Sequence, residues 1–279
     1  MKKLIIVLKS VVLVGLATIA LGACGTGSVL GTTLTVNGTT PGSPLARVAG
    51  SRSLASRSLG WVDIPVEDPA GTPVGIINLT TAKVVIKEMQ IEQEGVTDAL
   101  VDFEFNGPFV ADLITNTLDP QPMVADLPAG IYAQIEFKID KIEGDETDER
   151  GAALVPNDDP LFGHSILLEG SYTPTGGAAI PFSYTFDVDA EFQLKAAGDT
   201  ATGFEIAASG VNDIIIAFRL NKWFSGIDPA AFAADPAAFS EALKENIKLS
   251  ADYGKDTDGD GVLSSAEDDD PDSEDAEDA

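Results

Sequence analysis

The sequence predicts a mainly β protein, an antiparallel β-sandwich with a short C-terminal helical segment and a disordered acidic tail. Within residues 61–224, apolar side chains recur at every second position in one run after another, which is typical of strands with one buried face. Pro, Gly, Asn and Asp separate these runs. Strands do not alternate regularly with long helices, which is the pattern that would indicate a parallel sheet. We therefore expect two antiparallel sheets packed face to face.

The individual strands follow from this period of two. In residues 131–139, one face is predicted to be buried and carries Ile131, Ala133, Ile135, Phe137 and Ile139, and the other is predicted to be exposed and carries Tyr132, Gln134, Glu136 and Lys138. Other runs of this kind cover residues 101–105, 182–194 and 214–220. We expect residues 182–194 to form one long strand.

The chain begins with the features of an exported lipoprotein. Lys2 and Lys3 precede an apolar run that ends in L-G-A-C at Cys24, so residues 1–23 are predicted to be a signal peptide. The small residues before Cys24 resemble the lipobox of bacterial lipoproteins, which implies that Cys24 is lipidated and begins the mature chain. A free thiol and a transmembrane anchor are the alternatives. Gly25 in place of an aspartate favours the outer membrane or cell surface.

Composition divides the rest of the chain. Residues 24–60 are rich in Gly, Ser and Thr and contain a repeat of S-R-S-L, so they are predicted to be a flexible tether. After the sandwich, D-P-A-A-F occurs twice within residues 225–255, and each copy suits the first turn of a helix. The four-residue spacing of Phe239, Leu243 and Ile247 predicts that the second helix packs on the sandwich.

Residues 256–267, D-T-D-G-D-G-V-L-S-S-A-E, predict a calcium site. Calcium takes six to eight oxygen ligands at about 2.3–2.6 Å. Carboxylates at loop positions one, three, five and twelve, a carbonyl at seven and a hydroxyl that holds a water at nine supply them. Gly261 provides the sharp turn at position six. The corresponding ligands are Asp256, Asp258, Asp260, Val262 through its carbonyl, Ser264 through water, and Glu267.

This loop resembles the EF-hand, but Gly254 before it and Pro271 after it depart from the helix–loop–helix pattern. We expect weak binding, at about 10⁻⁴–10⁻³ M. An accidental match within an acidic tail is the alternative. Eight of the twelve residues 268–279 are acidic, and we expect this segment to be disordered without a cation.

Charge and composition exclude several classes of function. The 279 residues carry 17 basic and 45 acidic side chains, for a net charge of −28, which disfavours nucleic-acid binding. His164 is the only histidine and Cys24 the only cysteine, so a histidine triad or a multi-histidine zinc site is excluded. We predict no enzyme activity, although paired carboxylates such as those of Asp187, Asp189 and Glu191 leave glycoside hydrolysis open.

Three further segments carry a family resemblance. The stretch A-K-V-V-I-K-E-M-Q-I from Ala82, F-V-A-D-L-I from Phe109, and L-P-A-G-I-Y-A-Q-I-E-F-K-I from Leu127 resemble an uncharacterised domain family of bacterial lipoproteins. The resemblance implies a prealbumin-like or immunoglobulin-like sandwich and no catalytic residues.

Two functions follow as expectations. The first is a lipid-anchored cell-envelope module with a calcium loop and a structural or adhesive role. The alternative is a carbohydrate-binding or carbohydrate-hydrolysing surface lipoprotein that uses exposed aromatic rings and carboxylates. In either case the partner beyond the membrane is an unidentified protein or glycan.

Overall fold

The computed structural model describes residues 34–39, 61–68, 71–93, 101–120, 129–143, 146–147, 154–195, 204–207, 213–227, 236–256 and 263. Its strands are β1 (Leu34–Thr39), β2 (Val62–Glu67), β3 (Pro73–Gln93), β4 (Val101–Asp112), β5 (Thr117–Asp119), β6 (Gly130–Ile139), β7 (Ile166–Pro174), β8 (Ile180–Phe186), β9 (Ala190–Lys195), β10 (Phe204–Ile206), β11 (Asp213–Arg219) and β12 (Ala251–Asp256). Its helices are α1 (Leu220–Trp223) and α2 (Pro236–Lys248). Within these residues no helix is long and apolar enough to span a bilayer.

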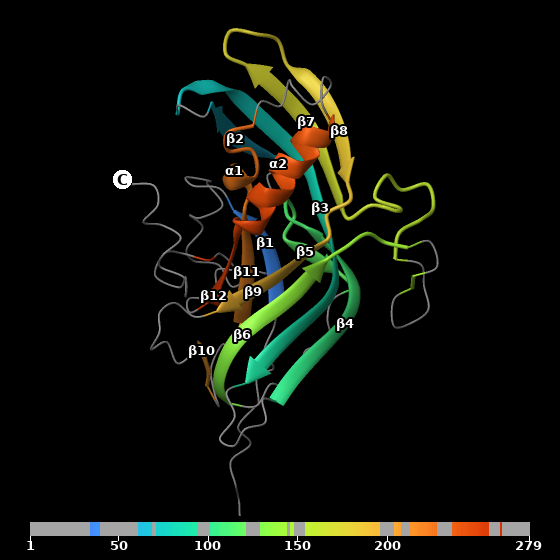
Figure 1. The fold of residues 1–279 in the computed structure, drawn as a ribbon, viewed down its shortest axis with the longest axis vertical. Helices are drawn as coiled ribbons and strands as arrows, with labels where there is room; N and C mark the ends of the chain where they lie inside the picture. The colour runs from blue at the N-terminus through green and yellow to red at the C-terminus, as the bar shows by residue number, and fades with distance from the viewer. Residues whose placement is uncertain are drawn as a thin grey trace, which may run out of the picture.

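The strands form two sheets, which confirms the predicted mainly β, sandwich-like fold (Figure 1). The large sheet contains nine of the described strands and is built on β3, whose 21 residues pair with β2 and β4 along one edge and with β7 and β6 along the other. The small sheet has the order β1-β11-β12. Its β1 and β11 run parallel, the one parallel pair among the described strands, and β12 is antiparallel to β11.

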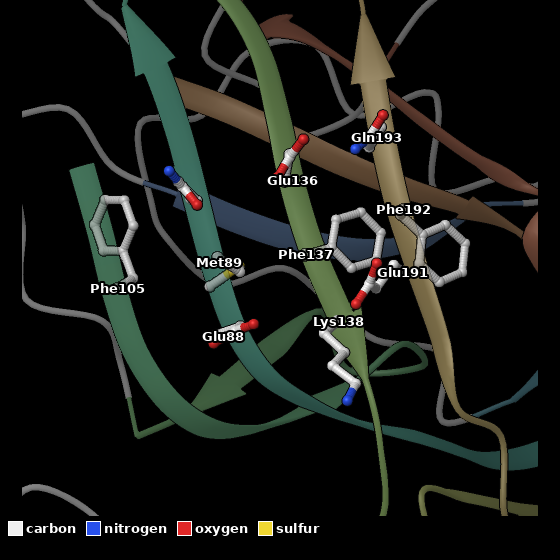
Figure 2. A pocket seen from close by; sticks show the side chains of 10 residues that line it. Glu88, Met89, Phe105, Glu136, Phe137, Lys138, Glu191, Phe192 and Gln193 are labelled. Carbon is white, nitrogen blue, oxygen red and sulfur yellow. The ribbon is translucent and has the colours of Figure 1, made fainter. Parts of the chain in front are cut away.

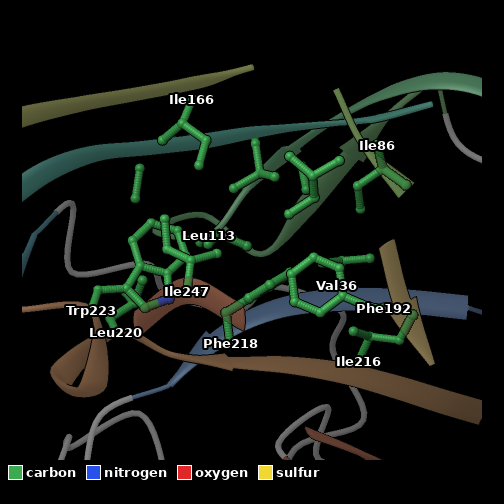
Figure 3. Packing of buried hydrophobic residues seen from close by; sticks show 14 of the residues in the cluster. Val36, Ile86, Leu113, Ile166, Phe192, Ile216, Phe218, Leu220, Trp223 and Ile247 are labelled. Carbon is green, nitrogen blue, oxygen red and sulfur yellow. The ribbon is translucent and has the colours of Figure 1, made fainter. Parts of the chain in front are cut away.

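The core lies between the two sheets. Side chains of β1 and β11, including Val36, Ile216 and Phe218, face Ile86 and Ile166 of the large sheet (Figure 3). These residues are at most 1 % exposed. Complete burial of a large apolar side chain contributes about 1.5–3 kcal/mol, so this interface is the main source of stability.

Aromatic rings join the sheets at the centre. Phe137 of β6 and Phe192 of β9 are opposite each other in register and stack with ring centroids 4.4 Å apart. Phe218 of β11 packs edge-on against both rings, at 5.9 and 6.0 Å, and against Trp223 of α1 at 5.9 Å. The Trp223 indole N–H donates to the Ser250 hydroxyl at 2.7 Å, which ties α1 to the turn before β12.

Helix α2 begins at Pro236 and docks as predicted. Phe239, Leu243 and Ile247 are all buried in the main core. The Phe239 ring packs 5.6 Å from Tyr184 and 6.0 Å from Phe186 on β8. The first D-P-A-A-F copy lies outside the described residues.

Two boundary predictions are wrong. Residues 34–39, predicted as part of the flexible tether, form β1, in which Val36, Asn37 and Gly38 are buried. The glycine is required because a Cβ at Gly38 would lie 2.4 Å from the carbonyl oxygen of Leu113, in the turn after β4. Residues 251–256, predicted as mostly helical, form β12 instead.

The predicted long strand over residues 182–194 is divided in two. Strand β8 pairs with β7, and β9 pairs with β6. Buried Ser165 holds the break at residues 187–189, since its hydroxyl donates to the Phe186 carbonyl at 3.0 Å and accepts from the Val188 N–H at 2.6 Å. The alternation continues through the break, because Phe186, Val188 and Phe192 are all buried.

At the start of β6, the observed buried and exposed side chains are the opposite of the predicted ones. Ile135, Phe137 and Ile139 are buried as predicted, but Ile131 is 38 % exposed and Tyr132 is buried. The register with β3 shifts between Glu92 and Gln93, and a one-residue bulge moves every earlier side chain to the opposite face. Burial raises the pKa of the Tyr132 hydroxyl to about 12.

The first prediction concerns the contact between β8 and α2. Phe186→Ala removes a ring that is 4 % exposed, so we expect it to lower the free energy of unfolding by about 3–5 kcal/mol in urea denaturation. Ser183→Ala on the exposed face of the same strand should change it by less than about 0.5 kcal/mol. Equal losses would contradict the observed assignment of faces.

Candidate functional site

Of the predicted calcium ligands, the described residues contain Asp256 alone. It is the last residue of β12, it is 3 % exposed, and its register partner on β11 is Asp213. Asp258, Asp260, Val262, Ser264 and Glu267 lie outside the described residues, as do Cys24, the signal peptide and the acidic tail. Leu263, at loop position eight, is half-buried.

A strand, not a helix, leads into the predicted calcium loop. Strand β12 is fixed at its start by an ion pair between Arg219 and Asp252, the latter 3 % exposed, and by a hydrogen bond from the Arg219 N–H to the Ser250 carbonyl at 2.8 Å. At its other end, the carboxylates of Asp213 and Asp256 occupy directly opposite positions.

The described part of the chain contains no complete metal site. No group of three or more His, Cys, Asp or Glu side chains lies close enough to hold an ion within it. Asp256 is the one predicted calcium ligand among the described residues, and its pairing within the small sheet fixes its backbone.

The outward face of the large sheet carries a second candidate site (Figure 2). There a hollow of about 220 Å³ lies over β3, β6 and β9, with Phe105 of β4 at one side. Strand register arranges its polar side chains in two rows across these strands. The rows are Glu88, Lys138 and Glu191, and Gln90, Glu136 and Gln193.

Lys138 is the one basic residue of this hollow. Its ammonium lies 3.3 Å from an Asp140 carboxylate oxygen and 3.6 Å from one of Asp189. The hydrogen bond to Asp140 and the negative charges of Asp140 and Asp189 raise the Lys138 pKa above its ordinary value of 10.5. The amine is therefore a charged hydrogen-bond donor at neutral pH, not a base.

Carboxylates and carboxamides in two rows can form hydrogen bonds with hydroxyl or amino groups. The aromatic rings at the hollow do not form an exposed platform, since Phe137 and Phe192 are at most 4 % exposed and face the core, and Phe105 is partly buried. Sequence reasoning missed this hollow because the cross-strand rows depend on register.

His164 precedes β7 and contacts the break between β8 and β9. Its Nδ1 is 2.7 Å from a carboxylate oxygen of Asp187, and its side chain is 37 % exposed. The adjacent Ser165 uses its buried hydroxyl for the backbone of residues 186 and 188, and does not present it as a nucleophile. Asp187, Asp189 and Glu191 are exposed, as expected for an outer face.

Comparison of the chain with protein-family models, curated proteins and solved structures finds no match.

The second prediction concerns Lys138. A raised amine pKa stabilises the fold below pH 10.5, and this contribution disappears as the pH rises through the pKa of the folded state. We expect NMR titration of the Lys138 amine to give a pKa above 10.5, and Asp140→Asn to lower it more than Asp189→Asn does. If Asp140→Asn leaves the pKa unchanged, the Asp140 contact does not form in solution.

Proposed function

We propose that the protein is a lipid-anchored cell-envelope module with a calcium site at residues 256–267 and a structural or adhesive role. The observation that carries the proposal is the position of Asp256. The first predicted ligand of the loop ends a strand whose other end is fixed by Arg219, Trp223 and Ser250.

The anchored strand partly takes the place of the missing entry helix. An EF-hand holds its first ligand at the end of a helix, whereas here the sheet holds the Asp256 backbone before any ion binds. Such preorganisation reduces the entropy cost of binding. Gly254 and Pro271 depart from the paired helices of an EF-hand, so the expected affinity is at the weak end of the EF-hand range, about 10⁻⁴–10⁻³ M.

The residues at the sheet end fit a calcium ion. Calcium binds carboxylate oxygens, and Asp213 and Asp256 place two carboxylates opposite each other at the start of a loop that supplies four more oxygen ligands through Asp258, Asp260, Val262 and Glu267, and one through a water on Ser264. When bound, the ion supplies positive charge and a coordination sphere that orders the loop. The proposed role is therefore structural, and no chemical step involves the metal.

The hollow over β3, β6 and β9 supports a second candidate, a carbohydrate ligand. Its carboxylates and carboxamides are suited to hydroxyl groups. Sugar-binding sites of the predicted kind also present an aromatic ring, and the described part of this face exposes none at the hollow. The calcium-binding envelope module is therefore our first conclusion.

The third prediction tests the calcium site by calorimetry on the protein that begins after Cys24. We expect one calcium ion per chain at about 10⁻⁴–10⁻³ M, and clearly weaker binding of magnesium, whose octahedral shell does not suit a bidentate carboxylate. Glu267→Gln and Asp256→Asn should each weaken calcium binding at least tenfold.

The matched control is Asp187→Asn, an exposed carboxylate at the break between β8 and β9 that should leave calcium binding unchanged. If all three variants bind calcium like the wild type, or if magnesium binds equally well, the acidic chain only attracts a diffuse ion atmosphere and the proposal fails.

A further inference from the structure

The large sheet has an exposed outward face where β2, β3, β7 and β8 lie side by side. Figure 1 shows β2, β7 and β8 together at the upper end of the molecule. Their core-facing side chains, such as Ile64, Ile77 and Tyr172, are buried, and both helices pack on that side. The buried positions 62, 64 and 66 of β2 direct the alternate residues, Trp61 and Asp63 among them, to the outward face.

Strand register arranges this face in rows that cross the strands. The middle row contains Asp63, Asn78 and Ser171, at directly opposite positions on β2, β3 and β7. Ile76 of β3 is in the next row on one side, and Trp61 is one row away on the other side. Strands lie about 4.8 Å apart and residues i and i+2 about 6.8 Å, so these five residues cover about 10 by 14 Å. We call them the Trp61 face.

Two exposed apolar side chains flank the polar row. Trp61 is 50 % exposed and Ile76 is 52 % exposed. Tryptophan is highly buried on average, so a ring that is half exposed on a strand is unusual. An indole presents a flat apolar surface together with one N–H donor, which suits a ligand that has both apolar and polar edges.

The polar row between them is held in a fixed arrangement. The Asn78 Nδ2 donates to a carboxylate oxygen of Asp63 at 2.8 Å. The other Asp63 oxygen and the Asn78 Oδ1 make no hydrogen bond within the described residues, so the pair still offers acceptors as well as the second Nδ2 hydrogen. Side chains that already hold each other lose little freedom when a ligand binds.

Charge determines which class of ligand suits this face. None of its five residues is basic and the protein has a net charge of −28, so an anionic ligand is repelled. Asp63 is its one carboxylate and already accepts from Asn78. The neighbouring carboxylate of Glu169 accepts from the hydroxyls of Thr81 at 2.9 Å and Ser183 at 3.2 Å. Both carboxylates thus have donors within the sheet, and a ligand with hydroxyl groups and no charge complements the face better than a cation does.

We propose that the Trp61 face binds an uncharged glycan. The apolar C–H face of one sugar ring stacks on the Trp61 indole, and hydroxyl groups of the adjoining sugar form hydrogen bonds with Asp63 and Asn78. Ile76 contacts the chain beyond the polar row. This glycan site requires neither the lipid anchor nor the calcium loop, so it goes beyond the proposed function and supplies a ligand for an adhesive role.

The Trp61 face is separate from the hollow over β3, β6 and β9. Asn78 and Glu88 are ten residues apart on β3, which corresponds to about 34 Å of extended strand. An exposed aromatic ring distinguishes the Trp61 face, because the rings at the hollow are buried or partly buried. The two sites can therefore be tested with separate substitutions.

The fourth prediction tests the glycan site by calorimetry on the protein that begins after Cys24. The probes are four uncharged oligosaccharides: cellohexaose, xylohexaose, mannohexaose and the hexamer of N-acetylglucosamine. We expect at least one to bind, with an affinity that about 1 M sodium chloride leaves unchanged, because no charged ligand group is involved. Trp61→Ala and Asn78→Ala should each weaken binding at least tenfold.

The matched control is Leu249→Ala, which removes an apolar side chain that is 74 % exposed after α2 and should leave binding unchanged. Circular dichroism and melting temperature should match the wild type for all three variants, because each changed residue lies at the surface. If Trp61→Ala melts at a lower temperature, Asn78→Ala and Asp63→Asn decide the result, and unchanged binding in both overturns the proposal.

Failure of this site differs from failure of the proposed function. If none of the four oligosaccharides binds with a Kd below about 10 mM, the glycan site is wrong, whatever calcium does. If a probe binds equally well to the wild type and Trp61→Ala, but more weakly to Glu88→Gln or Glu191→Gln, the sugar occupies the hollow and the Trp61 face is wrong. Trp61→Ala should bind calcium like the wild type, since the calcium site is independent of this face.

Discussion

The position of Phe218 between the two sheets is the contact on which the rest of the structure depends. Its ring packs edge-on against Phe137 and Phe192 of the large sheet and against Trp223, so it fixes where β11 lies. Aromatic pairs of this kind contribute about 0.5–1.5 kcal/mol beyond the burial of their area. Because β11 is the central strand of the small sheet, the same contact determines where β1 and β12 add on either side.

The proposed function follows from β11. Its pairing with β12 places Asp256 at one end of the small sheet and the ion pair of Arg219 and Asp252 toward the other. Its parallel pairing with β1 brings the first residue of β1 to the Asp256 end of the sheet. The strand that follows the proposed lipid anchor and the strand that precedes the proposed calcium loop thus start and finish at the same end of the sheet. The hollow over β3, β6 and β9 lies on the outward face of the other sheet and is independent of this arrangement.

The sequence predicted those features of the fold that depend on a local pattern of residues. Alternating residues identified the buried face of β9 and, from Ile135 onward, of β6, and four-residue spacing identified the docked face of α2. The same alternation predicted one exposed face for β11, which is buried on both faces because it is the central strand of the small sheet. Strand β1 was missed because its Gly38 and Asn37 resemble linker residues, although the glycine is needed where the strand approaches Leu113. Strand β12 was missed because its six residues, four of them buried and two of them the aspartates Asp252 and Asp256, show no apolar period. The bulge in β6 and the cross-strand rows at the hollow depend on register, which a single strand does not encode. The motif of the proposed calcium site is visible in the sequence, whereas the strand that ends at its first residue, Asp256, is not.

Hydrogen exchange at the amides of β12, with and without calcium, tests most directly whether the sheet holds the start of the calcium loop before the ion binds. We expect the amides of Asp252 and Gly254, which face β11, to exchange slowly in the absence of calcium, and calcium to add protection after Asp256. The contrary result is rapid exchange throughout β12 until calcium is added. In that case the ion would order the strand, and the sheet would not position Asp256.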